Sequence, residues 1–232
     1  MKDIMSVKDK HKGQTAFIVG CGPSLNEYTK EALMDYVKDD VILCIKQAQY
    51  EFVKECDYHF VNCNNLVYYE YPEKTEIVAS PATNLDFSPF CSKPVSYRFK
   101  IKKDRIIEKT VAGLKDFHLN EVTNSEPSST WGPGIMYEAV IPFAVHCGFS
   151  HIKFIGWDYT VNKQDGHLTH FYNHTQRRVF RRAAAPLAKN EAELVIESSE
   201  MLYHYLQSKG ITSEIISSQS SISNMFPRKC LK

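Results

Sequence analysis

Short apolar runs alternate with segments of helical periodicity along most of this chain. Four such runs, four or five residues long, cover residues 15–19, 41–45, 58–61 and 75–79, and two further predicted strands, which include polar residues, cover 152–155 and 211–216. Strands that read as continuous apolar runs are buried on both faces, which is typical of parallel sheets covered by crossover helices. A buried helix segment looks similar over so short a length, but the β-branched content and the flanking Gly or Asp residues favour strands.

Three longer segments carry the helical signal, and they are residues 26–37, 135–146 and 177–206. The third segment is broken near Pro186. Gly148 and Gly210 stand just beyond the second and third segments, where glycine commonly ends a helix. The alternation predicts an α/β fold of the Rossmann-like, doubly wound kind, with a mostly parallel sheet and helices on both faces.

The domain organisation follows from where this alternation holds. We predict a single nucleotide-binding domain over residues 1–232, with a core formed by 14–80 and 130–226. Residues 81–129 are irregular, because several prolines interrupt them and residues 98–109 are mainly basic. We interpret 81–129 as an insertion or a lid, and a surface excursion with a few short strands is the alternative.

The charge balance excludes one class of function. The 232 residues contain 28 Lys and Arg against 27 Asp and Glu, so the formal net charge is +1. Binding to nucleic acid by charge requires a basic excess or a basic stripe. The arginine pairs at 177–178 and 181–182 are the densest basic group, and a solvated helix face is the preferred interpretation of such a group. We therefore expect no nucleic-acid partner.

Cysteine usage and hydropathy bear on the compartment. The chain has seven cysteines, an odd number, and no two are spaced as Cys-x-x-Cys. Cys44 and Cys147 lie in or beside apolar runs, where a free cysteine behaves as a small hydrophobic residue. The N-terminal residues 1–12 are charged throughout, and the most apolar stretch, 134–149, is too short to span a bilayer. We predict a cytoplasmic protein without a transmembrane segment.

A glycine-containing turn at residues 20–24 is the strongest local signal for ligand binding. It reads Gly20-Cys21-Gly22-Pro23-Ser24 and stands between the first strand and the first helix. Glycines there let the backbone approach a ligand, and a helix N-terminus favours phosphate. The third glycine of the dinucleotide fingerprint and the Lys-Ser/Thr of a P-loop are absent. A tight turn in which Ser24 caps the helix, with no ligand, is the alternative.

A second signal follows the strand at 152–155. Gly156-Trp-Asp158 is succeeded by a segment that contains His167, His170 and His174. Ligands of open parallel sheets bind at the carboxyl ends of the strands, and Asp and His there supply general acid–base or metal-binding groups. The alternative is a polar loop with solvated histidines. A third glycine-containing helix start, residues 132–134, is either a second wall of the same pocket or a plain turn.

Three pieces of the chain, taken in order, resemble a known superfamily. They are Gly-x-Gly-Pro-Ser-Leu at 20–25, the glycine-started helix from 134, and Ile-x-Phe-Ile-Gly-x-Asp-Tyr at 152–159. Together they resemble the bacterial sialyltransferases of glycosyltransferase family 42. They equally resemble the DUF115 group, which includes motility-associated flagellin glycosyltransferases and the archaeal hydroxymethylpterin pyrophosphokinase. The resemblance covers about residues 15–50 and 130–226, including a final strand and Ser-rich loop near 215–227.

The resemblance implies roles for individual residues. The catalytic residues would be His174, His170 and Asp158. The residues that bind the nucleotide or the donor would be Gly20, Cys21, Gly22, Pro23, Ser24, Lys46, Gly132, Pro133, Gly134, Gly156, Tyr159 and Tyr172.

The general base remains open between two histidines. His170-Phe-Tyr-Asn-His174-Thr resembles the His-Tyr-x-x-His-Ser of the sialyltransferases, which implies His174. Gly166-His-Leu-Thr-His170 resembles the Gly-x-x-x-His of DUF115, which implies His170. We place His174 first, and His170 then orients the loop or binds the donor.

The chain departs from the sialyltransferase pattern at two places. It has Cys44-Ile-Lys46 where the family has Cys-Asn, and Trp131-Gly-Pro-Gly134 where the family has Thr-Ser-Gly. The ammonium of Lys46 can take the place of the Asn by contacting phosphate. These departures concern the identity of the donor more than the presence of a nucleotide site.

The resemblance leads to one expected function and two alternatives. We expect a glycosyltransferase that moves a sugar from a nucleotide-sugar donor, CMP-linked in the sialyltransferase version, to a hydroxyl of a surface glycan such as lipopolysaccharide or capsule. Backbone N–H groups of Gly22 and Ser24 would stabilise the departing phosphate, and no cofactor or metal would be required. One alternative is a diphosphotransferase that uses ATP and Mg²⁺, with Asp158 as a metal ligand. The other is a nucleotide-binding module without catalysis. Sialyltransferases of this type often form oligomers, so the resemblance also allows a homo-oligomer.

Overall fold

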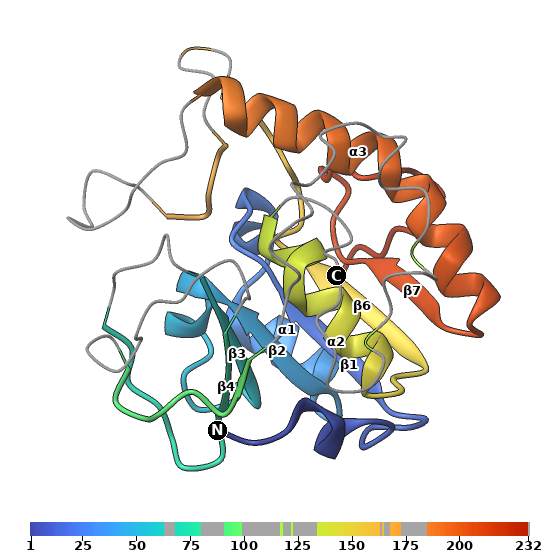
Figure 1. Cartoon of the computed structure of the whole chain (residues 1–232). Helices are drawn as coiled ribbons and strands as arrows, with labels where there is room; N and C mark the ends of the chain where they lie inside the picture. Colours follow the sequence, from blue (N-terminus) through green and yellow to red (C-terminus); the bar gives the residue numbers. More distant parts are fainter. Residues whose placement is uncertain are drawn as a thin grey trace.

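The described part of the chain folds around one parallel sheet. The computed structural model describes residues 1–62, 68–79, 91–98, 117, 122, 134–162, 164, 168–172 and 185–231, and for 185–190 it describes the backbone only. Within these residues the sheet has seven strands in the order β5-β4-β3-β2-β1-β6-β7 (Figure 1). All pairings between neighbouring strands are parallel. The predicted Rossmann-like α/β fold is confirmed.

The element boundaries fall close to the predicted ones. The strands are β1 (Thr15–Val19), β2 (Val41–Ile45), β3 (Tyr58–Val61), β4 (Glu76–Ala79), β5 (Tyr97–Arg98), β6 (His151–Ile155) and β7 (Thr212–Ile215). The α-helices are α1 (Lys30–Val37), α2 (Ile141–His146) and α3 (Ala185–Ser208). Short 3-10 helices η1 (Ile4–Val7), η2 (Pro23–Glu27) and η3 (Lys46–Tyr50), and a π-helix η6 (Met136–Val140), complete the set.

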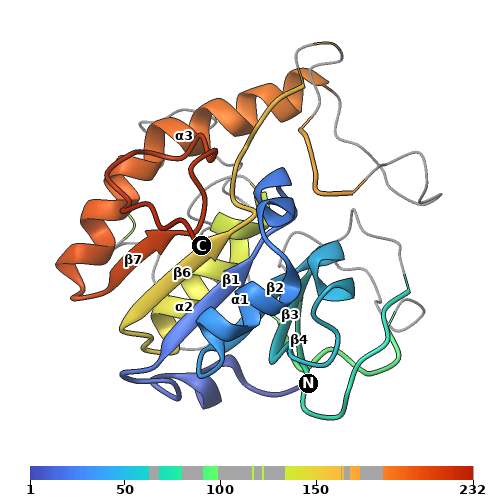
Figure 2. The same cartoon turned by 180° about the vertical axis from the view of Figure 1, so that it is seen from behind.

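Helices cover both faces of the sheet, as the apolar strands require. Along β1, Ala16 and Ile18 pack with α2 and α3, whereas Phe17 and Val19 pack with α1 on the other side. Figure 1 shows α2 in front of the sheet, and Figure 2 shows α1 in front after the half-turn. A strand between two apolar layers is apolar on both faces, which explains why β1 and β2 do not alternate between apolar and polar residues.

The helix predicted over 26–37 begins later than expected. η2 follows the glycine turn, the chain then bends, and α1 starts at Lys30 with Thr29 as its N-cap, whose Oγ1 accepts from the N–H of Ala32 at 3.2 Å. Asn, Ser and Thr can all begin a helix, and the sequence contains several of them here. The α-helix therefore does not start at the glycine turn, and the expected helix N-terminus beside a phosphate is not formed there.

The helix predicted over 135–146 contains a π segment. Pro142 has no N–H to donate to the carbonyl four residues earlier. The preceding turn makes hydrogen bonds to the carbonyl five residues earlier instead, as when the Ile141 N–H donates to the carbonyl of Met136. Gly148 ends the helix with φ +79°, as predicted. Segments of π-helix are frequent at functional sites, and this one lies beside the cavity described below.

Residues 81–129 are described only at 91–98, 117 and 122. Here β5 adds an edge strand to the sheet. The interpretation of this segment as an insertion or a lid stays a prediction, because most of it lies outside the described residues. α3 runs from Ala185 and includes Pro186 in its first turn, while 177–184 also lie outside. No helix in the described part of the chain combines the length and the apolar character needed to cross a membrane.

Candidate active site

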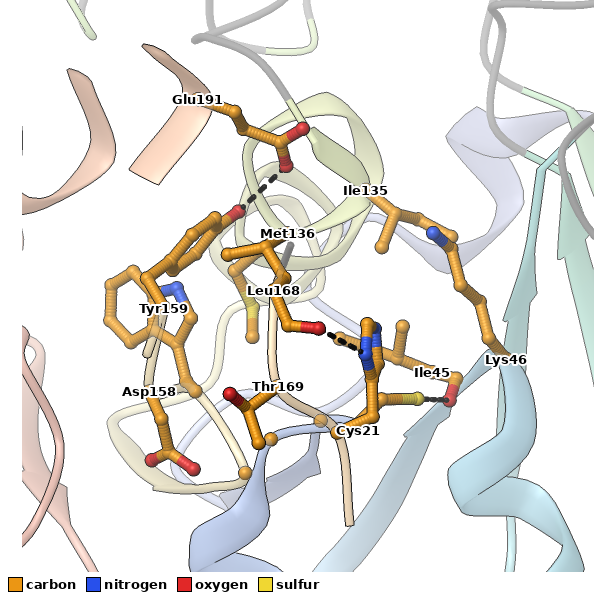
Figure 3. Close-up of a pocket in the computed structure, with 15 residues that line it drawn as sticks. Cys21, Ile45, Lys46, Ile135, Met136, Asp158, Tyr159, Leu168, Thr169 and Glu191 are labelled. Carbon is orange, nitrogen blue, oxygen red and sulfur yellow. Dashed lines mark hydrogen bonds between the residues drawn. The ribbon is translucent and has the colours of Figure 1, made fainter. Parts of the chain in front are cut away.

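The strand order places a cavity where a ligand is expected. The order reverses between β1 and β6, because β2 to β5 lie on one side of β1 and β6 and β7 on the other. Open α/β sheets bind ligands outside the carboxyl ends of the strands at such a reversal. A cavity of about 110 Å³ lies there, between the segments that follow β1, β2 and β6, residues 135–136 and α3 (Figure 3). Its volume is below the roughly 300–1,000 Å³ of pockets for whole small molecules, so it fits one moiety of a larger ligand.

A larger hollow of about 700 Å³ lies at the amino ends of the strands, among Lys8, Lys12 and Lys209. These three side chains are exposed, and Gly13 and Ser150, which precede β1 and β6, mark the edge opposite the strand-order reversal. Because ligands of open α/β sheets bind at the carboxyl ends of the strands, we place the site in the smaller cavity at the carboxyl edge.

The glycines after β1 and β6 allow the two turns to cross in contact. A Cβ at Gly20 would lie 2.3 Å from the carbonyl oxygen of Gly156, and a Cβ at Gly156 would lie 2.4 Å from that of Gly20. Gly156 also has φ +69°. The N–H of Gly20 donates to Ile155 O, and that of Gly22 donates to Gly156 O, both at 2.7 Å. The glycines are thus required by the packing of one turn on the other, whether or not a phosphate also approaches.

Ser24 and Asp158 join these two turns by buried hydrogen bonds. The backbone N–H of Ser24 donates to Oδ2 of Asp158 and its hydroxyl donates to Oδ1, each at 2.7 Å. The same hydroxyl accepts from the N–H of Gly156 at 2.9 Å. Both side chains are 2% exposed. Burial raises the pKa of Asp158, and the two bonds from Ser24 oppose that rise.

These hydrogen bonds bear on two expectations about the turn. The N–H groups of Gly22 and Ser24 already donate within the protein, so they are not available in this conformation to stabilise a departing phosphate. A Mg²⁺ ion on Asp158 does not fit either, because both carboxylate oxygens are buried and accept from Ser24. In the described part of the chain, no group of three or more His, Cys, Asp or Glu is arranged to hold a metal ion.

Lys46 lines the cavity from the end of β2. Its backbone has φ +48°, a conformation that is uncommon for a residue with a side chain. His59 Nε2 donates to the Lys46 carbonyl at 2.8 Å, and His59 Nδ1 accepts from the hydroxyl of Tyr71 at 2.7 Å. Burial lowers the pKa of His59 to about 3, so this ring is neutral and holds the strained backbone by one N–H. Toward the described residues, the Lys46 ammonium makes no ion pair or hydrogen bond.

His170 lies in the cavity wall. Its Nδ1 lies 3.0 Å from the carbonyl oxygen of Leu168. A carbonyl only accepts, so Nδ1 donates its proton in this hydrogen bond. His174, Gly132 and Pro133 lie outside the described residues.

A carboxylate that the sequence did not single out faces the same cavity. Glu191 comes from α3, and the hydroxyl of Tyr159 donates to its Oε1 at 3.2 Å (Figure 3). Tyr159 follows the β6 turn with φ +50°, and a Cβ at Gly134 would lie 2.3 Å from Oε1. Burial raises the pKa of Glu191, and the charge of Lys46 lowers it. Two of the three described non-glycine residues with positive φ, Lys46 and Tyr159, line this cavity.

The structure brings most of the predicted site residues together. The cavity wall contains Gly20, Cys21, Gly22, Lys46, Gly156, Asp158, Tyr159 and His170. Pro23, Ser24, Gly134 and Tyr172 support it from outside, Tyr172 by donating to the buried Gln47 at 3.1 Å. The residues that the prediction missed are Ile45, Ile135, Met136, Trp157, Leu168, Thr169 and Glu191.

Comparisons with known proteins support the fold. No model of a known protein family matches the chain, and no curated protein sequence matches it significantly. The MAf glycosyltransferase from Magnetospirillum magneticum AMB-1 superposes with a TM-score of 0.53 at 11% identity, over 99% of this chain and 38% of that chain. A mammalian sialyltransferase, solved with Gal-β-1-3GalNAc-ortho-nitrophenol, superposes with a TM-score of 0.42 at 13% identity, over 82% of this chain and 67% of that chain. This chain thus has the α/β fold seen in the MAf glycosyltransferase and spans well under half of its length.

Proposed function

We propose that this protein is a glycosyltransferase that takes a sugar from a nucleotide-sugar donor, with a CMP-linked donor favoured, to a hydroxyl of a surface-glycan acceptor. The observation that carries the proposal is the pairing of groups in one cavity at the strand-order reversal. The His170 ring and the Lys46 ammonium both line this cavity, and the ammonium makes no ion pair with a described residue. A base for a hydroxyl and a cation for a phosphate are the two groups that such a transfer needs.

In the proposed step, the His170 ring, which lies in the cavity wall, takes the proton of the acceptor hydroxyl. His174 lies outside the described residues and stays the alternative base. The acceptor oxygen then bonds to the anomeric carbon of the donor. The bond from that carbon to the phosphate oxygen breaks, and its electron pair leaves with the nucleotide. Lys46 stabilises the negative charge on the departing phosphate, in the role first expected of the Gly22 and Ser24 N–H groups. Asp158 and Ser24 act as positioning residues that hold the two turns.

Nucleotide binding tests the first half of the proposal. Thermal unfolding is followed with CMP, UDP, GDP and ATP, each with and without Mg²⁺. A ligand at a hundredfold excess over its Kd stabilises the folded state by about 2.7 kcal/mol. We expect stabilisation by at least one pyrimidine or guanine nucleotide without Mg²⁺, and its loss in Lys46→Ala. Lys38→Ala, which changes an exposed lysine, is the control. Stabilisation by ATP with Mg²⁺ alone would favour the diphosphotransferase and overturn the proposal.

Turnover tests the second half. Release of CMP from CMP-N-acetylneuraminic acid is compared among His170→Ala, His174→Ala and His204→Ala, the last being an exposed histidine of α3. His170→Ala is expected to lower the turnover number by roughly 10²–10⁴-fold while CMP still binds. A loss of that size in His174→Ala, with His170→Ala close to wild type, would transfer the role of base to His174.

A further inference from the structure

Glu191 occupies the cavity in a way that packing alone does not explain. Its Oε1 accepts a hydrogen bond from Tyr159. Its Oε2 makes no hydrogen bond to any described residue and is not one of the fully buried, unpaired polar atoms of the described chain. No cation lies within ion-pair distance of it in the described residues, although Lys46 is close enough to lower its pKa. A partly buried carboxylate that accepts one hydrogen bond and makes no ion pair is unfavourable, so a structural role would be better filled by a neutral side chain.

Three neighbouring features hold this carboxylate in place. The Tyr159 backbone adopts φ +50°, a conformation that is unfavourable for a non-glycine residue and persists only where the surroundings impose it. Gly134 lacks the Cβ that would collide with Oε1 of Glu191 and with the Tyr159 hydroxyl, at 2.3 and 2.7 Å. Tyr159 is half-buried against the core, and its hydroxyl donates toward α3. Backbone strain, a glycine and a hydrogen bond thus converge on one carboxyl group.

The cavity is therefore charged in two parts. Figure 3 shows Glu191 and Lys46 in different parts of the wall, with the Asp158 carboxylate turned away from both. The ammonium attracts an anionic group, whereas the carboxylate repels one and accepts hydrogen bonds only. A ligand that satisfies both parts carries a phosphate at one end and hydroxyl donors at the other.

We propose that Glu191, held by Tyr159, is a specificity-determining residue that binds a pair of hydroxyl groups of the donor. This inference rests on the proposed function. The hydroxyls belong either to the ribose of the nucleotide or to the transferred sugar, and both sources present the same chemistry. Hydrogen bonds to a charged group contribute about 1.5–3 kcal/mol, which corresponds to roughly 10–150-fold in Kd.

Titration calorimetry distinguishes the two sources. CMP, UDP and GDP, their 2′,3′-dideoxy analogues, and CMP-N-acetylneuraminic acid, UDP-N-acetylglucosamine and GDP-mannose are titrated into the wild type, Glu191→Ala, Glu191→Gln and Tyr159→Phe. If the ribose is bound, Glu191→Ala weakens the nucleotide and the nucleotide sugar alike by roughly 10–100-fold and leaves the dideoxy analogue unchanged. If the sugar is bound, only the nucleotide sugar is weakened. In either case Tyr159→Phe has a smaller effect in the same direction.

Glu197→Gln is the matched control, because Glu197 lies exposed on the same helix. Glu191→Gln keeps the shape and the acceptor for Tyr159, so it separates the loss of charge from a loss of folding. Affinities in Glu191→Ala within twofold of wild type for every ligand would overturn this inference alone. Failure of the wild type to bind any of the nine ligands would instead overturn the proposed function, and the inference with it.

Discussion

The Ser24 hydroxyl is the smallest group whose removal should open the two turns of the site. In Ser24→Ala, the buried N–H of Gly156 loses its acceptor and Asp158 loses one of its two donors. A buried donor without a partner costs about 1–3 kcal/mol, and a hydrogen bond to a charged group contributes about 1.5–3 kcal/mol. We expect the free energy of unfolding to fall by about 3–5 kcal/mol near neutral pH.

The pH dependence of this loss has a defined sign. Burial raises the pKa of Asp158 above its ordinary 3.8, and the Ser24 bonds counteract that rise, so Ser24→Ala raises the pKa further. Between 3.8 and the raised value the folded state binds more protons than the unfolded state, so stability increases as the pH falls through this window. This pH interval, from 3.8 to the raised pKa of Asp158, is wider in Ser24→Ala than in the wild type. The deficit of Ser24→Ala should therefore shrink as the pH is lowered toward 4.

Urea denaturation of wild type, Ser24→Ala and Ser221→Ala over this pH range measures the effect. Ser221 is an exposed serine of the C-terminal loop whose N–H, not its hydroxyl, contacts the carbonyl of Asp158. Its substitution should change the stability by less than about 0.5 kcal/mol. A deficit in Ser24→Ala no larger than that of Ser221→Ala, or one that grows as the pH falls, would refute the role given to the hydroxyl.

Three further predictions concern the same region. Gly156→Ala places a Cβ against the carbonyl oxygen of Gly20, whereas Gly210→Ala has a similar positive φ with open space around its Cβ. Urea denaturation should show Gly156→Ala to be less stable than Gly210→Ala by at least about 2 kcal/mol. Equal losses would contradict the close contact between the Gly20 and Gly156 turns. Burial raises the pKa of Glu191, so its charged form is unfavourable in the folded state near neutral pH. Glu191→Gln removes this charge, so the melting temperature should rise by roughly 2–4 °C. A lower melting temperature would indicate that the charge stabilises the fold. His59→Leu releases the Lys46 carbonyl, so nucleotide affinity and its salt dependence should both fall toward those of Lys46→Ala; unchanged salt dependence would deny His59 a positioning role.

The sequence predicted the sheet because its central strands β1 and β2 are apolar on both faces. β1 and β2 were located to the residue, since their runs end at a glycine and begin after an aspartate. α1 was misplaced because several residues near Asn26 can begin a helix, and only the folded chain shows that Thr29 does. The π segment before α2 depends on how Pro142 is accommodated, which helical periodicity does not encode.

The site was predicted where glycine turns and polar residues follow strands. Gly20, Gly156 and Asp158 do meet, but for a reason that the pattern could not supply, because the contact joins residues more than 130 positions apart. Glu191 could not be singled out, since it is one of several glutamates in a long helix, among them Glu193 and Glu197. Its distinction is that it faces the cavity beside Tyr159, and this depends on how α3 packs over the sheet.

A crystal structure with the nucleotide that stabilises the protein in the thermal screen would show whether the nucleotide binds at the carboxyl edge of the sheet. We predict that the phosphate lies within hydrogen-bond distance of the Lys46 ammonium, between the Gly20–Gly22 and Gly156–Tyr159 turns, with His170 beside it. Nucleotide density at the opposite edge of the sheet, among Lys8, Lys12 and Lys209, would contradict it.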